Sequence, residues 1–137
     1  ENCTAEKFGG GIYTQGTLTM NNCTLTGNKA KPNGGGVYVG KNGKFTMKGS
    51  SRITPSTAPN KGKNDVFLAG TSKITIDGVL SPVDGIAARI TPTSYGNNVK
   101  VLDGTSELLN SEHGKFKVTP KNGGGWKVDH TGHLYEG

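Results

Sequence analysis

Three features of the sequence predict an all-β fold, a solenoid of stacked coils. The run Gly-Gly-Gly-Ile-Tyr at residues 9–13 returns as Gly-Gly-Gly-Val-Tyr at residues 34–38. Apolar-polar-apolar triplets recur at residues 18–20, 45–47 and 74–76. No stretch has a convincing helical periodicity. A unit of roughly 25 to 30 residues that repeats in this way is typical of solenoids, in which each unit buries its apolar side chains against its neighbour.

The composition fits such a stack. Glycine contributes 23 of the 137 residues, and apolar residues make up only 31%. This composition can also indicate disorder, but the regular spacing of the triplets favours a folded chain. We expect a single domain over residues 1–137, with regular coils over 1–85 and irregular coils with a C-terminal cap over 86–137.

Each unit is predicted to contain short strands separated by turns. The first unit has strands at 12–14, 17–20 and 23–26; the second has them at 37–39, 45–47 and 51–53; the third has them at 66–68 and 74–76. A polar loop, Thr54–Asn64, closes the second unit and is expected to project from the stack. Later strands are predicted at 88–90, 99–101, 116–118 and 126–128, with a turn of helix at 107–110.

Alignment of the units predicts which side chains stack, because alternate residues of a strand point to opposite faces. One inward column contains Leu18, Phe45 and Ile74, and Thr19, Thr46 and Thr75 form an outward column. A neighbouring outward column, Thr17, Lys44 and Lys73, is interrupted by lysines, so a regular ice-binding face is not expected. The residues predicted to build the repeat are Gly10, Gly11, Ile12, Leu18, Met20, Cys23, Gly35, Gly36, Val37, Phe45, Met47, Ile74 and Ile76.

The two cysteines, Cys3 and Cys23, occur in matching Asn-Cys-Thr contexts. We expect both to point inward in successive coils as small apolar residues. A disulfide between them is the alternative, although parallel side-chain vectors suit its geometry poorly. At the other end of the chain, Trp126, Leu134 and Tyr135 are the candidates for covering the last coil, since an open stack exposes apolar side chains and unpaired backbone groups.

The segment Cys23–Ala30 leading into Gly34–Tyr38 resembles the repeats of the chlamydial polymorphic outer-membrane proteins, which pair a Gly-Gly-aliphatic motif with Phe-x-x-Asn. Similar repeats occur in large treponemal surface proteins, whose ends resemble the Trp126–Asp129 and Gly132–Leu134 segments of this chain. In this sequence Leu25 replaces the usual Phe. The resemblance implies a right-handed parallel β-helix displayed at a bacterial surface, and with the repeat it predicts a single-stranded stack of about four to five coils.

An enzyme has to be weighed against this interpretation, because a glycosidase needs only two suitably spaced carboxylates. Asp77 and Asp103 each precede a glycine, and equivalent corners would bring their carboxylates together; a groove that also held Asp84 would favour a carbohydrate-active β-helix. Asp-Gly is also ordinary turn chemistry. Arg52 and Arg89 lack the neighbouring acid cluster that a calcium-dependent lyase requires, so we expect no catalytic residues.

Charge and metal chemistry limit the expected partners. The net charge is +6, and the lysines are spread singly along the chain, which favours solubility over specific binding of nucleic acid. His130 and His133, with Asp129, are expected to be exposed turn residues rather than metal ligands, and no cofactor is predicted. No apolar run reaches membrane-spanning length, so membrane insertion is not expected. The chain starts within a repeat without a signal peptide, and we expect it to be a piece of a longer protein.

The function that fits these features best is a non-catalytic segment of a bacterial surface-exposed or secreted protein, acting in adhesion. Expected partners are a host surface protein, the extracellular matrix or a glycan, and neighbouring β-helix coils of the parent protein. The candidate contact residues lie at the ends of the long loop and within it: Thr54, Lys61, Lys63 and Asn64. The alternatives are a polysaccharide-binding or carbohydrate-active β-helix and a purely structural stalk or cap.

Overall fold

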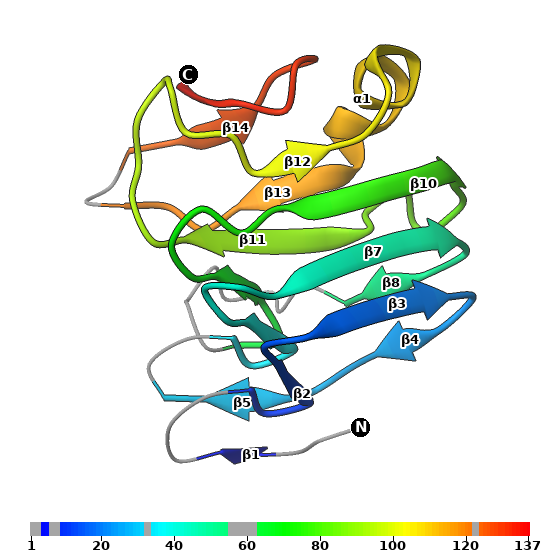
Figure 1. Ribbon diagram of the computed structural model, residues 1–137, viewed down its shortest axis with the longest axis vertical. Helices are drawn as coiled ribbons and strands as arrows, with labels where there is room; N and C mark the ends of the chain where they lie inside the picture. The colour runs from blue at the N-terminus through cyan, green and yellow to red at the C-terminus, as the bar shows by residue number, and fades with distance from the viewer. Residues whose placement is uncertain (1–3, 6–8, 32–33, 55–62, 122–123) are drawn as a thin grey trace.

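The structure is a computed structural model that describes residues 9–31, 34–54, 63–121 and 124–137, together with the backbone of residues 4–5. It is a β-solenoid of about three turns built from parallel sheets, which confirms the predicted all-β solenoid. In Figure 1 the strands form a stack of rungs that rises from β1, near the N-terminus, to β14 and the helix α1, near the C-terminus.

Two larger sheets form walls of the stack within the described residues. One has the order β13-β11-β9-β6-β2, from β2 (Ile12–Thr14), β6 (Val37–Val39), β9 (Val66–Leu68), β11 (Ala88–Pro92) and β13 (Phe116–Val118). The other has the order β12-β10-β7-β3, from β3 (Thr17–Asn21), β7 (Lys44–Gly49), β10 (Ile74–Leu80) and β12 (Leu102–Asp103). Smaller parallel pairs join β4 (Thr24–Leu25) to β8 (Arg52–Ile53), and β1 (Thr4–Ala5) to β5 (Lys29–Ala30). Parallel pairing therefore continues well beyond residue 85.

The strand register confirms the predicted columns. Phe45 lies between Leu18 and Ile74, and Met47 lies between Met20 and Ile76. The side chains at Phe45, Met47 and Ile74 are fully buried, and Leu18, in the first coil, is partly buried. Ile12, Val37 and Val66 form a further column in the other wall. The core is thus a set of apolar columns that run along the stack.

The glycine runs permit the close approach of consecutive coils. The backbone N–H of Gly11 donates to the carbonyl oxygen of Gly35 at 2.9 Å. A Cβ atom at Gly10 would lie 2.6 Å from that same oxygen, and one at Gly36 would lie 2.6 Å from Cγ2 of Ile53. A side chain at Gly10 would therefore push the neighbouring coil away, and one at Gly36 would collide with the core of its own coil.

The C-terminal end combines a helix with an antiparallel hairpin. Helix α1 (Ser106–Glu112) starts at Thr105, whose hydroxyl accepts a hydrogen bond from the N–H of Leu108, and continues into the 3-10 helix η1 (His113–Lys115). It confirms the helical turn predicted at 107–110. The hairpin joins β14 (Trp126–Val128) to β15 (Leu134–Glu136), and Leu134 is fully buried while Trp126 packs against the core.

Several local predictions are wrong. The strand expected at 99–101 is displaced to β12; Lys100 instead makes an isolated antiparallel bridge with His133. Thr4 pairs with Lys29 and not with Thr24, although the two threonines follow matching Asn-Cys pairs in the sequence. Cys23 is a free, exposed cysteine rather than an inward residue. Asn22 adopts a left-handed conformation with φ of 55°, and the chain turns outward there. Cys3 lies outside the described residues.

A stack of aromatic rings runs along the outer side of the sheet β13-β11-β9-β6-β2. The rings of Tyr13 and Tyr38 are 5.1 Å apart between centroids, and those of Tyr38 and Phe67 are 4.9 Å apart. Burial, with a smaller contribution from Tyr13, raises the pKa of the Tyr38 hydroxyl. The ring contacts therefore stabilise consecutive coils, and Tyr13, at the end of the stack, remains 48% exposed.

Candidate functional site

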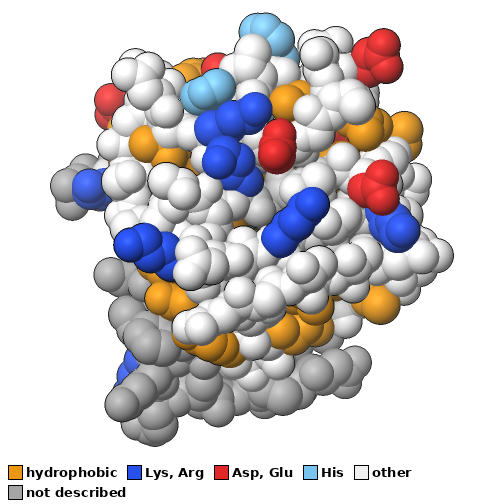
Figure 2. Space-filling model, viewed as in Figure 1, with side chains coloured by type: hydrophobic (Ala, Val, Ile, Leu, Met, Phe, Trp, Pro, Cys, Tyr) orange, Lys and Arg blue, Asp and Glu red, His pale blue; other side chains and the backbone are white. Residues whose placement is uncertain are grey.

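The outward face of the sheet β12-β10-β7-β3 carries three polar columns. The central column contains Thr19, Thr46 and Thr75 in successive strands, followed by Asp103 in β12. One outer column contains the residues that directly precede the inward apolar residues, such as Lys44. The other contains the residues that follow them, such as Lys48. In Figure 2, which views this face, lysine or arginine side chains gather around an acidic one on the upper part of the stack. The face is therefore polar and unevenly charged.

The two outer columns differ in charge. At one end of the strands, Lys48 and Asp77 pair with 3.8 Å between Nζ and Oδ2. At the other end, Lys44, the first residue of β7, and Lys73, which immediately precedes β10, come directly before the paired residues Phe45 and Ile74. This end of the outer face therefore carries two lysines where the opposite end carries a lysine and an aspartate.

Carboxylates do not compensate this charge. Ion pairs within the described residues join Lys48 to Asp77, Arg52 to Asp84, Lys100 to Asp103 and Lys115 to Glu112. In the same part of the chain, Lys41, Lys44 and Lys73 have no carboxylate within ion-pair distance. Nζ of Lys73 instead donates to the carbonyl oxygen of Thr71 at 3.1 Å. The positive charge of this corner is therefore available to a ligand.

These three lysines line an open groove of about 270 Å³, together with hydroxyl groups of Thr71 and Thr75. Two equivalent reverse turns form its floor: the N–H of Gly43 donates to the oxygen of Gly40, and the N–H of Ser72 donates to that of Ala69. The buried Ser72 hydroxyl donates to the oxygen of Gly40 at 2.7 Å and joins the two turns. The groove is therefore held in place by its own backbone. We call it the lysine groove.

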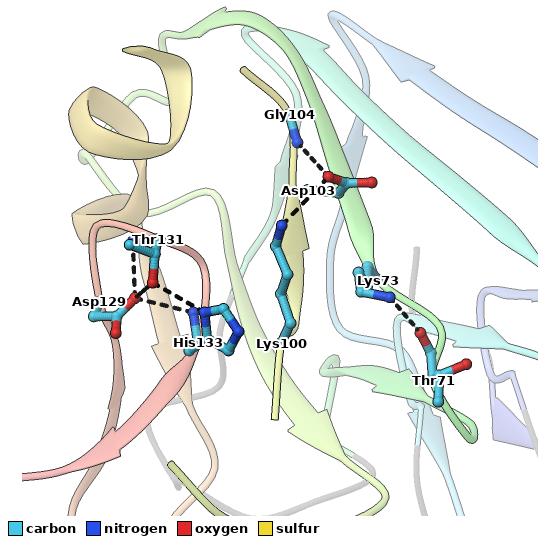
Figure 3. A network of polar contacts seen from close by, with 8 residues as sticks. All are labelled: Thr71, Lys73, Lys100, Asp103, Gly104, Asp129, Thr131 and His133. Carbon is cyan, nitrogen blue, oxygen red and sulfur yellow. Dashed lines mark hydrogen bonds and ion pairs between the residues drawn. The ribbon is translucent and has the colours of Figure 1, made fainter. Parts of the chain in front are cut away.

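A second depression of about 290 Å³ continues from the lysine groove on the far side of residues 71–73. Its polar lining includes Thr93, whose hydroxyl accepts from the N–H of Gly70 at 3.0 Å and donates to the oxygen of Leu68 at 2.7 Å. Figure 3 shows Lys100, which lines this depression, pointing toward Asp103, with 3.7 Å between Nζ and Oδ1. Oδ1 of Asp103 also accepts from the N–H of Gly104 at 2.9 Å. The two hollows thus adjoin at residues 71–73, and the second one also has an apolar lining that includes Leu68, Pro92 and Val99.

The cluster of Asp129, Thr131 and His133 in Figure 3 stabilises the turn of the C-terminal hairpin. Oδ1 of Asp129 accepts from the hydroxyl of Thr131 at 2.6 Å and from the N–H of His133 at 3.0 Å. Burial by itself raises the pKa of Asp129, but the hydrogen bonds from Thr131 and His133 outweigh it and lower that pKa. His130 is an exposed turn residue, as predicted, whereas His133 is half-buried and bridges to Lys100. No group of three metal-ligating side chains occurs among the residues described.

The long loop predicted to make contacts is described only at its ends. Thr54 and Lys63 are half-buried and line a hollow of about 200 Å³. Asn64 is buried, and its side-chain amide donates to the carbonyl oxygens of Thr54 at 2.6 Å and Leu25 at 3.0 Å. Asn64 therefore holds the two ends of the loop together, and its side chain is committed to the backbone rather than exposed to a ligand. Lys61 lies outside the described residues.

The acids considered for catalysis lie in separate settings. Asp103 pairs with Thr75 in register and not with Asp77, so the two Asp-Gly corners are not equivalent. The exposed carboxylates of Asp77, Asp84 and Asp103 each contact a different cation. The structure therefore does not bring these carboxylates together as the pair that a glycosidase requires. The arrangement supplies anion-binding and hydroxyl groups rather than an acid–base pair.

Comparisons of this chain with protein-family models, with curated proteins and with solved structures found no match. Among the residues described, the one α-helix, α1, has seven residues and is too short to cross a membrane. The site is therefore argued from the chain's own geometry.

The sequence contains one sign of the lysine groove, the alignment of Lys44 with Lys73. Lys44 and Lys73 were aligned correctly, but as an interruption of a threonine column. Lys41 was assigned only to a turn. Their significance depends on the contrast with the ion pair of Lys48 and Asp77, which follows once the register of β7 and β10 is known.

Proposed function

We propose that this chain is a non-catalytic binding segment of a bacterial surface-exposed or secreted protein, acting in adhesion to a host surface protein, the extracellular matrix or a glycan. The observation that carries the proposal is the lysine groove, an open polar hollow on a backbone-braced floor with uncompensated positive charge. A groove whose floor is fixed by hydrogen bonds loses little conformational entropy when a ligand binds.

The finer features of the fold belong to the same proposal. We take the stack to be a right-handed single-stranded β-helix of four to five coils, in which α1 and the β14–β15 hairpin cap the C-terminal end. The likeness of its Gly-Gly-aliphatic motifs to chlamydial and treponemal surface repeats supports an extracellular or cell-surface location. Neighbouring β-helix coils of a longer parent protein remain proposed partners, at the end of the stack opposite α1.

The test is an array of glycans and matrix proteins probed with the 137-residue chain at low and at high salt. Two variants locate the surface: Lys44→Gln with Lys73→Gln in the lysine groove, and Thr54→Ala with Lys63→Gln beside the long loop. We expect specific binding that persists near physiological ionic strength, about 0.15 M, and that one of the two variants loses. Binding that disappears with moderate salt for every ligand would mean nonspecific attraction. No binding to any ligand would favour a structural stalk.

A further inference from the structure

The lysine groove and the adjoining depression have a composition that restricts the class of ligand. Three ammonium groups, from Lys41, Lys44 and Lys73, are suited to anionic groups. Hydroxyl groups of Thr71 and Thr75 and the carboxylate of Asp103 line the same hollow. A carboxylate accepts hydrogen bonds and repels anions. A ligand that satisfies the whole set therefore carries both negative charges and hydroxyl donors.

Assuming the binding role proposed above, we propose that this surface binds an acidic polysaccharide, one whose sugar units carry sulfate or carboxylate groups. The ammonium groups would contact the charged substituents, and Asp103 would accept hydrogen bonds from the sugar hydroxyls. Lys44 begins β7 and Lys73 immediately precedes β10, and neighbouring strands of a sheet lie about 4.8 Å apart. That spacing is comparable to the length of one sugar unit in an extended chain, so consecutive units would meet consecutive coils.

Two other polyanions fit less well. Single-stranded nucleic acid is bound by aromatic side chains on which bases stack. The groove and the adjoining depression contain no aromatic side chain among the described residues that line them. A phosphate backbone would also be repelled by Asp103. An anionic membrane surface is flat, whereas Lys44 and Lys73 line a concave groove, which suits a narrow, linear ligand.

The experiment is a titration, followed by NMR of backbone amides and by calorimetry, with tetrasaccharides that differ in charge. One is a sulfated heparin-type fragment, one is an oligogalacturonate with carboxylates only, and one is neutral cellotetraose. Oligothymidylate is the nucleic-acid probe. We expect the sulfated or the carboxylated fragment to bind and to shift amides of residues 41–44 and 71–75, with cellotetraose and oligothymidylate binding at least tenfold more weakly.

Lysine variants test the location. Lys44→Gln and Lys73→Gln should each raise Kd by up to about fivefold, and the double variant by about tenfold, because each removes one solvent-exposed ion pair. Lys117→Gln is the matched control, since Lys117 is an exposed strand residue on the other wall; it should change Kd less than twofold. Circular dichroism checks that each variant is folded.

Any other result contradicts the inference, and each one indicates a different explanation. An equal loss with Lys117→Gln would mean that only the overall charge attracts the ligand. Unchanged affinity in the double variant would place the site elsewhere, and equal binding of oligothymidylate would make the groove a general polyanion site. If matrix proteins or neutral glycans still bind the double variant, the proposed adhesion role stands without this ligand. If no probe and no array ligand binds the wild-type chain, both proposals fail.

Discussion

The two faces of the sheet β12-β10-β7-β3 are built from alternate residues of the same strands, yet they follow different rules. On the inner face, Phe45, Met47 and Ile74 are fully buried and stack in apolar columns. On the outer face, Thr46 and Thr75 are partly exposed, and lysines and aspartates flank them. The transfer of apolar surface from water determines the inner face, whereas little in the fold constrains the outer one. Residues that contact a ligand are therefore free to occur on the outer face without disturbing the core.

The largest expected effect comes from placing a charge on the inner face. Ile74→Asp buries a carboxylate with no partner among the apolar columns, at a cost on the order of 5 kcal/mol, comparable to the whole stability of many small domains. We expect loss of the folded circular dichroism signal at room temperature. Thr75→Asp, one residue further on the outer face, should stay folded. A variant Ile74→Asp that melts like the wild type would show that the inward columns are wrong.

A smaller effect is expected where a buried charge is already paired. Oε1 of Glu112 accepts from Nζ of Lys115 at 2.9 Å and from the N–H of Leu80, and the side chain is 2% exposed. Glu112→Gln should lower the free energy of unfolding by about 1.5–3 kcal/mol, because it removes hydrogen bonds made to a charged group. Urea denaturation measures this. Glu107→Gln, an exposed change in the same helix, is the control and should have almost no effect.

The stabilisation from Glu112 should also depend on pH. Burial alone raises the pKa of Glu112, but the hydrogen bonds from Lys115 and Leu80 outweigh it, so the pKa lies below its ordinary value. A lowered pKa in the folded state means that the stabilisation is complete above the unfolded pKa, about 4.3, and is lost as the pH falls through the folded pKa. Wild type and Glu112→Gln should therefore converge in stability in acid. Parallel curves down to the lowest measurable pH would contradict this.

The inner face was predictable from sequence, and so were the strands at 88–90, 116–118 and 126–128 and the helical turn at 107–110, which lie within β11, β13, β14 and α1. The long-range contacts of the C-terminal region were not predictable. A period of two within a strand and a recurring triplet together fix which side chains stack, so Leu18, Phe45 and Ile74 could be aligned correctly. Contacts such as that between Glu112 and the backbone of Leu80 join segments that share no repeat, and the sequence contains no sign of them. The strand predicted at 99–101 failed because Val99 and Lys100 bond to the hairpin instead.

The candidate site was predictable only in part. The long loop was chosen because loops of solenoids often carry binding residues, but Asn64 is buried between its ends. The alignment of Lys44 with Lys73 was predicted correctly, but their place in the lysine groove was not. Among the described residues, Lys44 and Lys73 lack a carboxylate partner, whereas Lys48 has Asp77. That comparison requires the three-dimensional structure.

Two charge reversals test the difference between the ends of the outer face. Lys44→Glu places a carboxylate beside Lys73, and it should raise the free energy of unfolding by about 0.2–1 kcal/mol because opposite charges then face each other. Lys48→Glu places a carboxylate beside Asp77 and should lower it by a similar amount. Thermal melts at low salt measure both variants against wild type. Changes of the same sign in the two variants would show that Lys44 and Lys73 do not repel each other.

The smallest effect is expected for Asp77→Asn, which removes the attraction to Lys48 without creating repulsion. Lys48 and Asp77 are 39% and 67% exposed, and exposed ion pairs contribute only about 0.2–1 kcal/mol. We expect a destabilisation of a few tenths of a kcal/mol at low ionic strength, measured by urea denaturation with the Lys48→Gln variant completing a double-mutant cycle. The coupling should vanish near 1 M salt, where the Debye length is about 3 Å. A coupling that persists there would mean that Lys48 and Asp77 interact by something other than a screened charge attraction.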